Sequence, residues 1–126
     1  TLRNSSAASD VYKRQAWLWA GLDWEKCVSK NDNAERLCGV VMQSDDKSAL
    51  CKKWEKAFGI KADEDLQINL SDSRIKFVDN LDQRGEGINA FELSVKNKEV
   101  VYEKATELGL IKNDLIHIGG VNFLLQ

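Results

Sequence analysis

The chain has 126 residues, a length that suits one folded domain. Apolar residues make up 43% of it, and charged residues make up 30% with a net charge of −2. This near balance lacks the basic surplus of nucleic-acid-binding proteins and the acidic blocks of disordered tails. No apolar run approaches the ~20 residues that span a bilayer, so we expect neither a nucleic-acid nor a membrane partner.

Cysteine and histidine usage limits the chemistry further. The three cysteines, Cys27, Cys38 and Cys51, form no CxxC pair, which predicts a reduced, cytoplasmic protein. Cys38 and Cys51 lie inside apolar patterns, where we expect buried structural thiols, with a nucleophilic cysteine as the alternative. The single histidine, His117, excludes a multi-histidine metal site within one chain.

The first 15 residues show no hydrophobic period, and the chain does not begin with methionine. Residues 10–15 read DVYKRQ, which resembles the translation of a transposon-end adaptor used in sequencing libraries. We therefore expect residues 1–15 to be an artefact or disordered, and the natural protein to extend further upstream.

Residues 16–36 are rich in tryptophan, with Trp17, Trp19 and Trp24 close together. Large aromatic side chains favour a surface that they can cover. One interpretation is a linker to a missing upstream domain, packed on the outside of the next domain. The other is an interface, either with that upstream domain or with a second copy in a homodimer.

A strand and a helix are predicted next. Leu37–Gln43 is a short apolar run typical of a buried strand. Ser44, Asp45 and Asp46 offer side-chain oxygens for a helix start, and the helix is predicted to end at Gly59. The apolar positions of this helix recur with helical spacing, so one stripe should face the sheet.

A hairpin and a long loop follow. Strands at 66–70 and 74–79 are predicted on either side of a Ser71–Ser73 turn, because apolar and polar residues alternate there. The loop over 82–87 is polar and contains two glycines, so it cannot pack a core. We interpret it as the joint between two copies of one unit.

The second copy repeats the first. A strand at 88–95 precedes a helix that Asn97 can cap, and Gly119-Gly120 is a two-residue turn between two final strands. Equivalent positions lie about fifty residues apart, which indicates an internal duplication. We expect the apolar helix positions to be mostly buried, namely Leu50, Trp54, Phe58, Val101, Ala105 and Leu108.

The predicted fold class is therefore α+β. Two β-α-β-β modules, at about 37–80 and 88–126, should form one curved mixed sheet as an open half-barrel, with the helices on its convex side. The concave face would then line a cleft.

Paired modules of this kind resemble the vicinal oxygen chelate superfamily, which includes glyoxalases, bleomycin-resistance proteins and dioxygenases. The segments FVDNLDQRGEGINAFELSV and IHIGGVNFLL look like glyoxalase-like members, and LDW at 22–24 is similar to the connector before the second domain of some two-domain members. The resemblance covers 37–126 and implies a glyoxalase-like domain at the end of a larger protein.

Catalytic members of that superfamily hold a divalent metal through His, Gln or Glu on the first and last strand of each module. The first-strand positions fall at about Cys38 and Ala90, and neither is a hard-metal ligand. Glu92 lies two residues further on the same face and would bind metal only weakly by itself. A divalent metal stays open, but because its usual ligands are absent we expect no cofactor.

Three functions follow as expectations. The first is metal-independent binding of an unknown small molecule that is largely uncharged and carries a donor group. The second is a metal-dependent lyase or dioxygenase whose ligands come from a missing domain or a partner chain, and the third is a dimerisation module. Alternation predicts the cleft-lining residues, unless side chains pack the cleft shut: Cys38, Val40, Met42, Ala90 and Glu92, with His117 also facing it.

Overall fold

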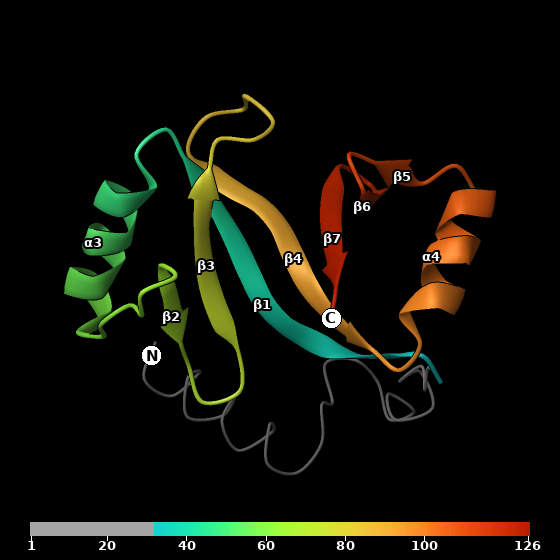
Figure 1. The fold of residues 1–126 in the computed structure, drawn as a ribbon, viewed down its shortest axis with the longest axis horizontal. Coiled ribbons are helices and arrows are strands. Elements are labelled where there is room, and N and C mark those ends of the chain that lie inside the picture. The colour runs from blue at the N-terminus through green and yellow to red at the C-terminus, as the bar shows by residue number, and fades with distance from the viewer. Residues whose placement is uncertain (1–31) are drawn as a thin grey trace, which may run out of the picture. The chain divides into compact units, whose positions relative to one another are not determined.

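Residues 32–126, the part of the chain that the computed structural model describes, form two helices and one open seven-stranded mixed sheet (Figure 1). The predicted α+β class is confirmed. The expectations for residues 1–15 and for the tryptophan-rich segment up to residue 31 lie outside the described residues. The elements are β1 (Ala34–Ser44), α3 (Lys47–Phe58), β2 (Gln67–Asn69), β3 (Arg74–Asp79), β4 (Gly87–Val95), α4 (Lys98–Glu107), β5 (Ile111–Lys112), β6 (Leu115–Ile118) and β7 (Val121–Leu125).

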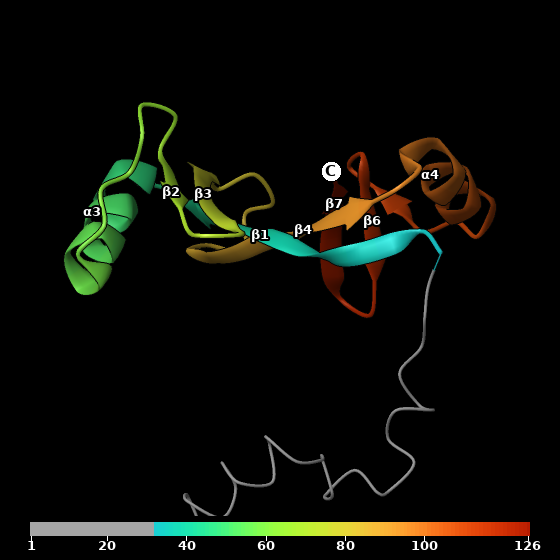
Figure 2. The same cartoon turned by 90° about the horizontal axis from the view of Figure 1, so that it is seen from below.

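The sheet contains two similar halves. Its strand order is β2-β3-β1-β4-β7-β6-β5, and β1 and β4 pair antiparallel at the centre. Each central strand also pairs in parallel with the last strand of its own half, β1 with β3 and β4 with β7. Helices α3 and α4 lie at opposite ends of the sheet in both views (Figures 1 and 2). The first half therefore has the predicted β-α-β-β succession, and the second half has a similar one with the additional short strand β5 after its helix.

Register shows which face of the sheet each helix covers. Residues paired across neighbouring strands point to the same face. Val40 of β1 is paired with Ile75 of β3, which packs in the core beneath α3. On its other side Val40 is paired with Phe91 of β4. Phe91 is in turn paired with Phe123 of β7, which lies beside α4. Both helices therefore cover one face, which we call the helix face. The opposite face, which we call the open face, carries the neighbouring residues of the same strands.

The main core lies between α3 and its half of the sheet. Leu50, Cys51, Ile68 and Phe77 are its buried members, and Met42 and Trp54 pack against them. The ring of Trp54 contacts the ring of Phe77 with 6.0 Å between centroids. Burial of Cys51 raises the pKa of its thiol, with nearby Glu55 and Asp63 adding to the effect, as expected for a structural cysteine.

Two predicted core residues are exposed. Phe58 is 62% exposed and Leu108 is also 62% exposed, so the prediction that both would be buried is wrong. Phe58 is the last residue of α3 and Leu108 is the cap of α4, so both lie at helix ends. Phe58 instead stacks on Trp54 at 5.4 Å. Ala105 is buried as predicted, and Val101 is half-buried.

The turns and caps follow local chemistry. Asp46 caps α3 by accepting from the Ala49 amide at 2.9 Å, and Asn97 caps α4 by accepting from the Val100 amide at 3.2 Å. Gly59 ends α3 with a φ of 65°, a left-handed conformation that suits glycine. Both residues of the predicted Gly119-Gly120 turn have positive φ. None of the described helices is long and apolar enough to cross a membrane.

Candidate functional site: a polar hollow on the open face

A hollow of about 430 Å³ lies between the loop that joins β3 to β4 and the turns of the β5–β6–β7 segment. Its size falls within the range of small-molecule sites, about 300–1,000 Å³. Most of the residues that line it are polar or charged, including Asp82, Arg84, Asn89, Lys112, His117 and Asn122. Leu81 and Leu115 add a short apolar wall.

Gln43 is bonded to two residues that line this hollow, Asp82 and Asn89. Its side chain is only 1% exposed, although the amide is fully polar. It donates to Asp82 Oδ1 at 2.6 Å and to the Gly85 carbonyl at 2.9 Å, and its Oε1 accepts from Asn89 Nδ2 at 2.9 Å. A buried amide is costly unless it is bonded in this way, so Gln43 fixes both the loop and Asn89.

A β-bulge brings Asn89 to Gln43. The register of β1 against β4 shifts between Val41, which pairs with Ala90, and Met42, which pairs with Ile88. Asn89 is the extra residue, and a bulge re-aims the side chain of such a residue. Asn89 is therefore buried and bonded to Gln43.

The hydrogen-bonded chain continues to the histidine. Asn122 Nδ2 donates to the Asn89 carbonyl at 3.0 Å, and Asn122 Oδ1 lies 2.6 Å from His117 Nδ1. His117 and Asn122 are also paired in register across β6 and β7. The imidazole is thus held on the wall of the hollow by the same network that begins at Gln43.

Asp82 holds the charged side of the hollow. Hydrogen bonds lower the pKa of its carboxyl, first from Gln43, then from the backbone amide and guanidinium of Arg84, while partial burial acts in the opposite direction. The Arg84 guanidinium lies 2.6 Å from Asp82 Oδ2 and also donates to the Ile88 carbonyl at 3.2 Å. Asp82 therefore stays ionised and pairs with Arg84.

The loop over 80–86 is fastened to the end of β1 by further bonds. Ser44 donates to Glu86 Oε2 at 3.0 Å, and Asn80 donates to Asp45 Oδ1 at 3.0 Å. Asn80 also accepts from the Gly85 amide at 3.3 Å. The wall that Leu81, Asp82 and Arg84 supply is therefore preformed.

A second polar cluster on the open face centres on Glu92. Its side chain is fully buried and accepts from Arg74 Nε at 2.7 Å and from Arg74 Nη2 at 3.2 Å. Both residues are register partners of Gly39, so the ion pair crosses β1 over a residue without a side chain. The hydrogen bond to Glu92 raises the pKa of Arg74, and the negative charge of Glu92 raises it further. Partial burial of Arg74 acts in the opposite direction. A shallower hollow of about 340 Å³ lies beside this pair and is lined by Arg36, Cys38, Arg74 and Gln126 among others.

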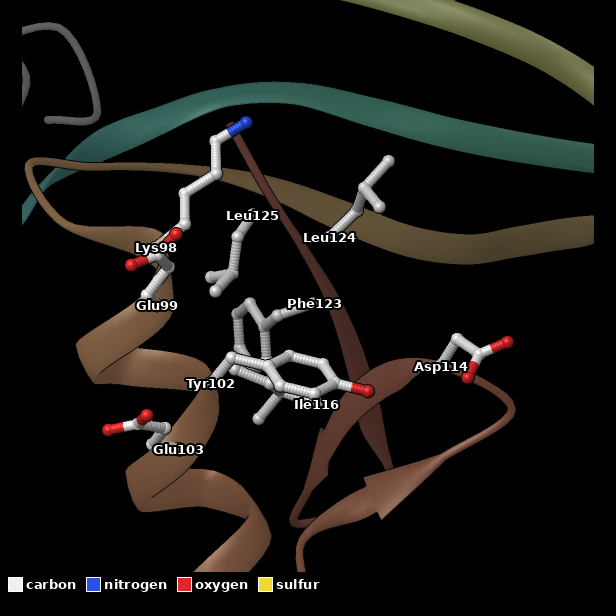
Figure 3. A pocket seen from close by; sticks show the side chains of 9 residues that line it. All are labelled: Lys98, Glu99, Tyr102, Glu103, Asp114, Ile116, Phe123, Leu124 and Leu125. Carbon is white, nitrogen blue, oxygen red and sulfur yellow. The ribbon is translucent and has the colours of Figure 1, made fainter.

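An open groove of about 470 Å³ separates α4 from β6 and β7 (Figure 3). Tyr102 projects from α4 into the space that Ile116 and Phe123 face from the strands. Charged side chains also line the groove: Lys98, Glu99, Glu103 and Asp114. The groove arises because α4 buries only one of its residues, Ala105, so its contact with the sheet is incomplete.

The predicted cleft-lining residues occupy different places. His117 lines the polar hollow, and Cys38 lines the shallower hollow, where its thiol donates to the Glu92 carbonyl at 3.5 Å. Ala90 and Glu92 are on the open face but are 2% and 0% exposed. Met42 packs on the helix face beneath α3, and register places half-buried Val40 on that face too. The set predicted by alternation is therefore not brought together in one cleft.

Sequence reasoning missed the amides that build the polar hollow. Gln43, Asn89 and Asn122 each interrupt an apolar strand pattern, and a polar residue in such a position calls for a buried partner. The sequence carries that signal but does not show which of these residues contact one another.

No protein-family model matches the chain, and no curated protein matches it. Within 32–126, no group of three or more His, Cys, Asp or Glu side chains is arranged to hold a metal ion.

Proposed function

We propose that this domain binds a small organic molecule in the polar hollow between the 80–86 loop and the β6–β7 hairpin. The observation that carries the proposal is the continuous hydrogen-bonded chain from Asp82 through Gln43, Asn89 and Asn122 to His117. Such a network is costly to build within a sheet, and it fixes polar groups at the wall of a hollow of ligand size.

The resemblance to glyoxalase-like proteins supports the same proposal. The repeated module and the open seven-stranded sheet agree with the architecture that the resemblance implies. In that superfamily ligands bind on the face of the sheet opposite the helices, and the hollow lies on this chain's open face. We propose that the domain is a glyoxalase-like part of a larger cytoplasmic protein.

Metal-independent binding is part of the proposal. The resemblance places first-strand metal ligands at about Cys38 and Ala90, where the chain offers a thiol and a methyl group. Glu92, the nearest carboxylate on that face, is fully buried and already bonded twice to Arg74. A metal ion would have to displace this ion pair, and its remaining protein ligands would have to come from elsewhere.

A fragment screen followed by backbone amide chemical shifts tests the proposal. We expect hits at millimolar concentration or better to shift the amides of Asn89, His117 and Asn122. The variant His117→Ala should weaken these hits, whereas Tyr102→Ala, which alters the groove beside α4, should leave them unchanged. Shifts confined to Tyr102 and Phe123, or no hits at all, would contradict the proposed site.

The alternative functions are outcomes of parallel measurements. Elemental analysis of protein incubated with Mn, Fe, Ni or Zn should find no near-stoichiometric retained metal, and retention would favour the lyase or dioxygenase reading instead. Light scattering that gives the mass of a stable dimer, together with an empty fragment screen, would favour the dimerisation module.

A further inference from the structure

The Asn122 amide has one orientation that satisfies both of its partners. Its neighbour on one side is the Asn89 carbonyl, which only accepts, so the NH₂ group must face it. The amide oxygen must then face His117, and it lies 2.6 Å from Nδ1. Because that oxygen only accepts, His117 Nδ1 must carry the hydrogen.

This assignment defines what His117 offers to the hollow. In the neutral ring only one nitrogen carries a hydrogen, so Nε2 keeps its lone pair and accepts hydrogen bonds. His117 is one of the residues lining the hollow and is half-buried. A ligand that occupies the hollow therefore meets an oriented acceptor, which favours a hydroxyl or N–H donor.

The charges around the hollow add a second requirement. Asp82 and Arg84 are paired at 2.6 Å and cancel each other. Lys112 also lines the hollow and is exposed, and it takes part in none of the ion pairs among the described residues. One positive charge is thus left over, which favours an anionic group on the ligand. Leu81 and Leu115 favour a short apolar body.

We infer that the hollow selects small hydroxycarboxylates with a short apolar substituent, with the hydroxyl donating to His117 Nε2 and the carboxylate near Lys112. This inference rests on the proposed function, since it names the ligand class of the same site. It replaces the largely uncharged ligand expected from the sequence, because Lys112 joins the hollow only through the fold of the β5–β6 turn.

The tautomer is tested without any ligand. The chain has one histidine, so a long-range ¹H–¹⁵N correlation spectrum of labelled protein contains one imidazole. In the neutral ring we expect the hydrogen on Nδ1, and Asn122→Ala should shift the population toward hydrogen on Nε2. A parent protein with the hydrogen on Nε2 would overturn the inference.

The ligand class is tested with three compounds of one skeleton: mandelate, phenylacetate, which lacks the hydroxyl, and 1-phenylethane-1,2-diol, which lacks the carboxylate. Mandelate should bind at least about fivefold more tightly than either, the worth of about one hydrogen bond. His117→Ala should remove its advantage over phenylacetate, and Lys112→Ala its advantage over the diol.

The outcomes separate this inference from the proposed function. If phenylacetate or the diol binds the parent protein as tightly as mandelate, the inference is overturned even if His117→Ala fails to fold. If fragments of other classes shift Asn89 and Asn122 while mandelate does not bind, the hollow remains a ligand site and the ligand class is wrong. If nothing shifts these residues, both are wrong.

Discussion

Replacing Gly39 with alanine should be one of the most damaging single-methyl changes in the domain. A Cβ at this position would lie well within 3.0 Å of Glu92 Oε2, at 3.1 Å from Glu92 Cδ and at 3.0 Å from the Arg74 carbonyl. The carboxylate cannot move freely, because Glu92 is fully buried and Gln126 Nε2 lies 3.3 Å from its other oxygen. Either β1 moves away from β3 and β4, or the Arg74–Glu92 pair is distorted.

The magnitude follows from these two routes. Overpacking a filled site costs about 1–3 kcal/mol. Separating a buried carboxylate from its partner costs about 3–5 kcal/mol, and less here because about a third of the Arg74 side chain is exposed. We expect Gly39→Ala to lower the free energy of unfolding by about 2–4 kcal/mol. For a domain of this size each 1 kcal/mol lowers Tm by about 4–8 °C.

Thermal and urea unfolding monitored by circular dichroism measure this loss. Gly87→Ala is the matched control, since Gly87 lies in β4 with nothing within 4 Å of its added Cβ and no positive φ. It should be neutral or stabilising by up to about 1 kcal/mol. In a Glu92→Ala background the Gly39→Ala cost should fall, because the crowding carboxylate is gone and only the close approach to the Arg74 carbonyl remains. Equal effects of Gly39→Ala and Gly87→Ala would refute the reasoning.

Two further stability predictions concern the core and the loop. Trp54→Ala should lower the free energy of unfolding by about 3 kcal/mol, which is the low end for a large aromatic because Trp54 is half-buried. In the same urea titration, Phe58→Ala should cost under about 1 kcal/mol because Phe58 is exposed. The pKa of Asp82 is lowered in the folded state, so its stabilising effect is present above the unfolded value of about 4 and is lost as pH falls through the folded pKa. Asp82→Asn should therefore lower Tm at pH 7, and the difference from the parent should shrink below about pH 4. A Tm difference that stays constant across this range would contradict the role given to the Asp82 carboxylate.

Local sequence signals predicted the elements whose causes are local. Asp46 and Asn97 each place a side-chain oxygen where a helix begins, and Gly59 ends a helix in a conformation that few other residues adopt. The strand β5 was missed because two residues are too short to show a period. Its turn uses Asn113 and Asp114 at positive φ rather than glycine, so it gave a weaker signal.

The candidate site was harder to predict because its geometry depends on how strands meet. Val40 and Met42 were assigned to the cleft by alternation, but β1 has register shifts against β4, and pairing with β3 places these residues on the helix face. The bulge at Asn89 is invisible in a single strand, since it exists only as a mismatch between two. The Arg74–Glu92 pair likewise depends on Gly39 from a third strand.

Both halves of the repeat contribute residues to the network around the polar hollow, but different ones. Gln43 comes from the central strand of the first half, and Asn89 and Asn122 come from strands of the second half. The 80–86 loop joins the halves and is bonded to the end of β1. A ligand in the hollow would therefore contact groups whose positions depend on the β1–β4 pairing. Ligand binding and the union of the halves should then stabilise each other, because a molecule that binds only the joined arrangement shifts the equilibrium toward it.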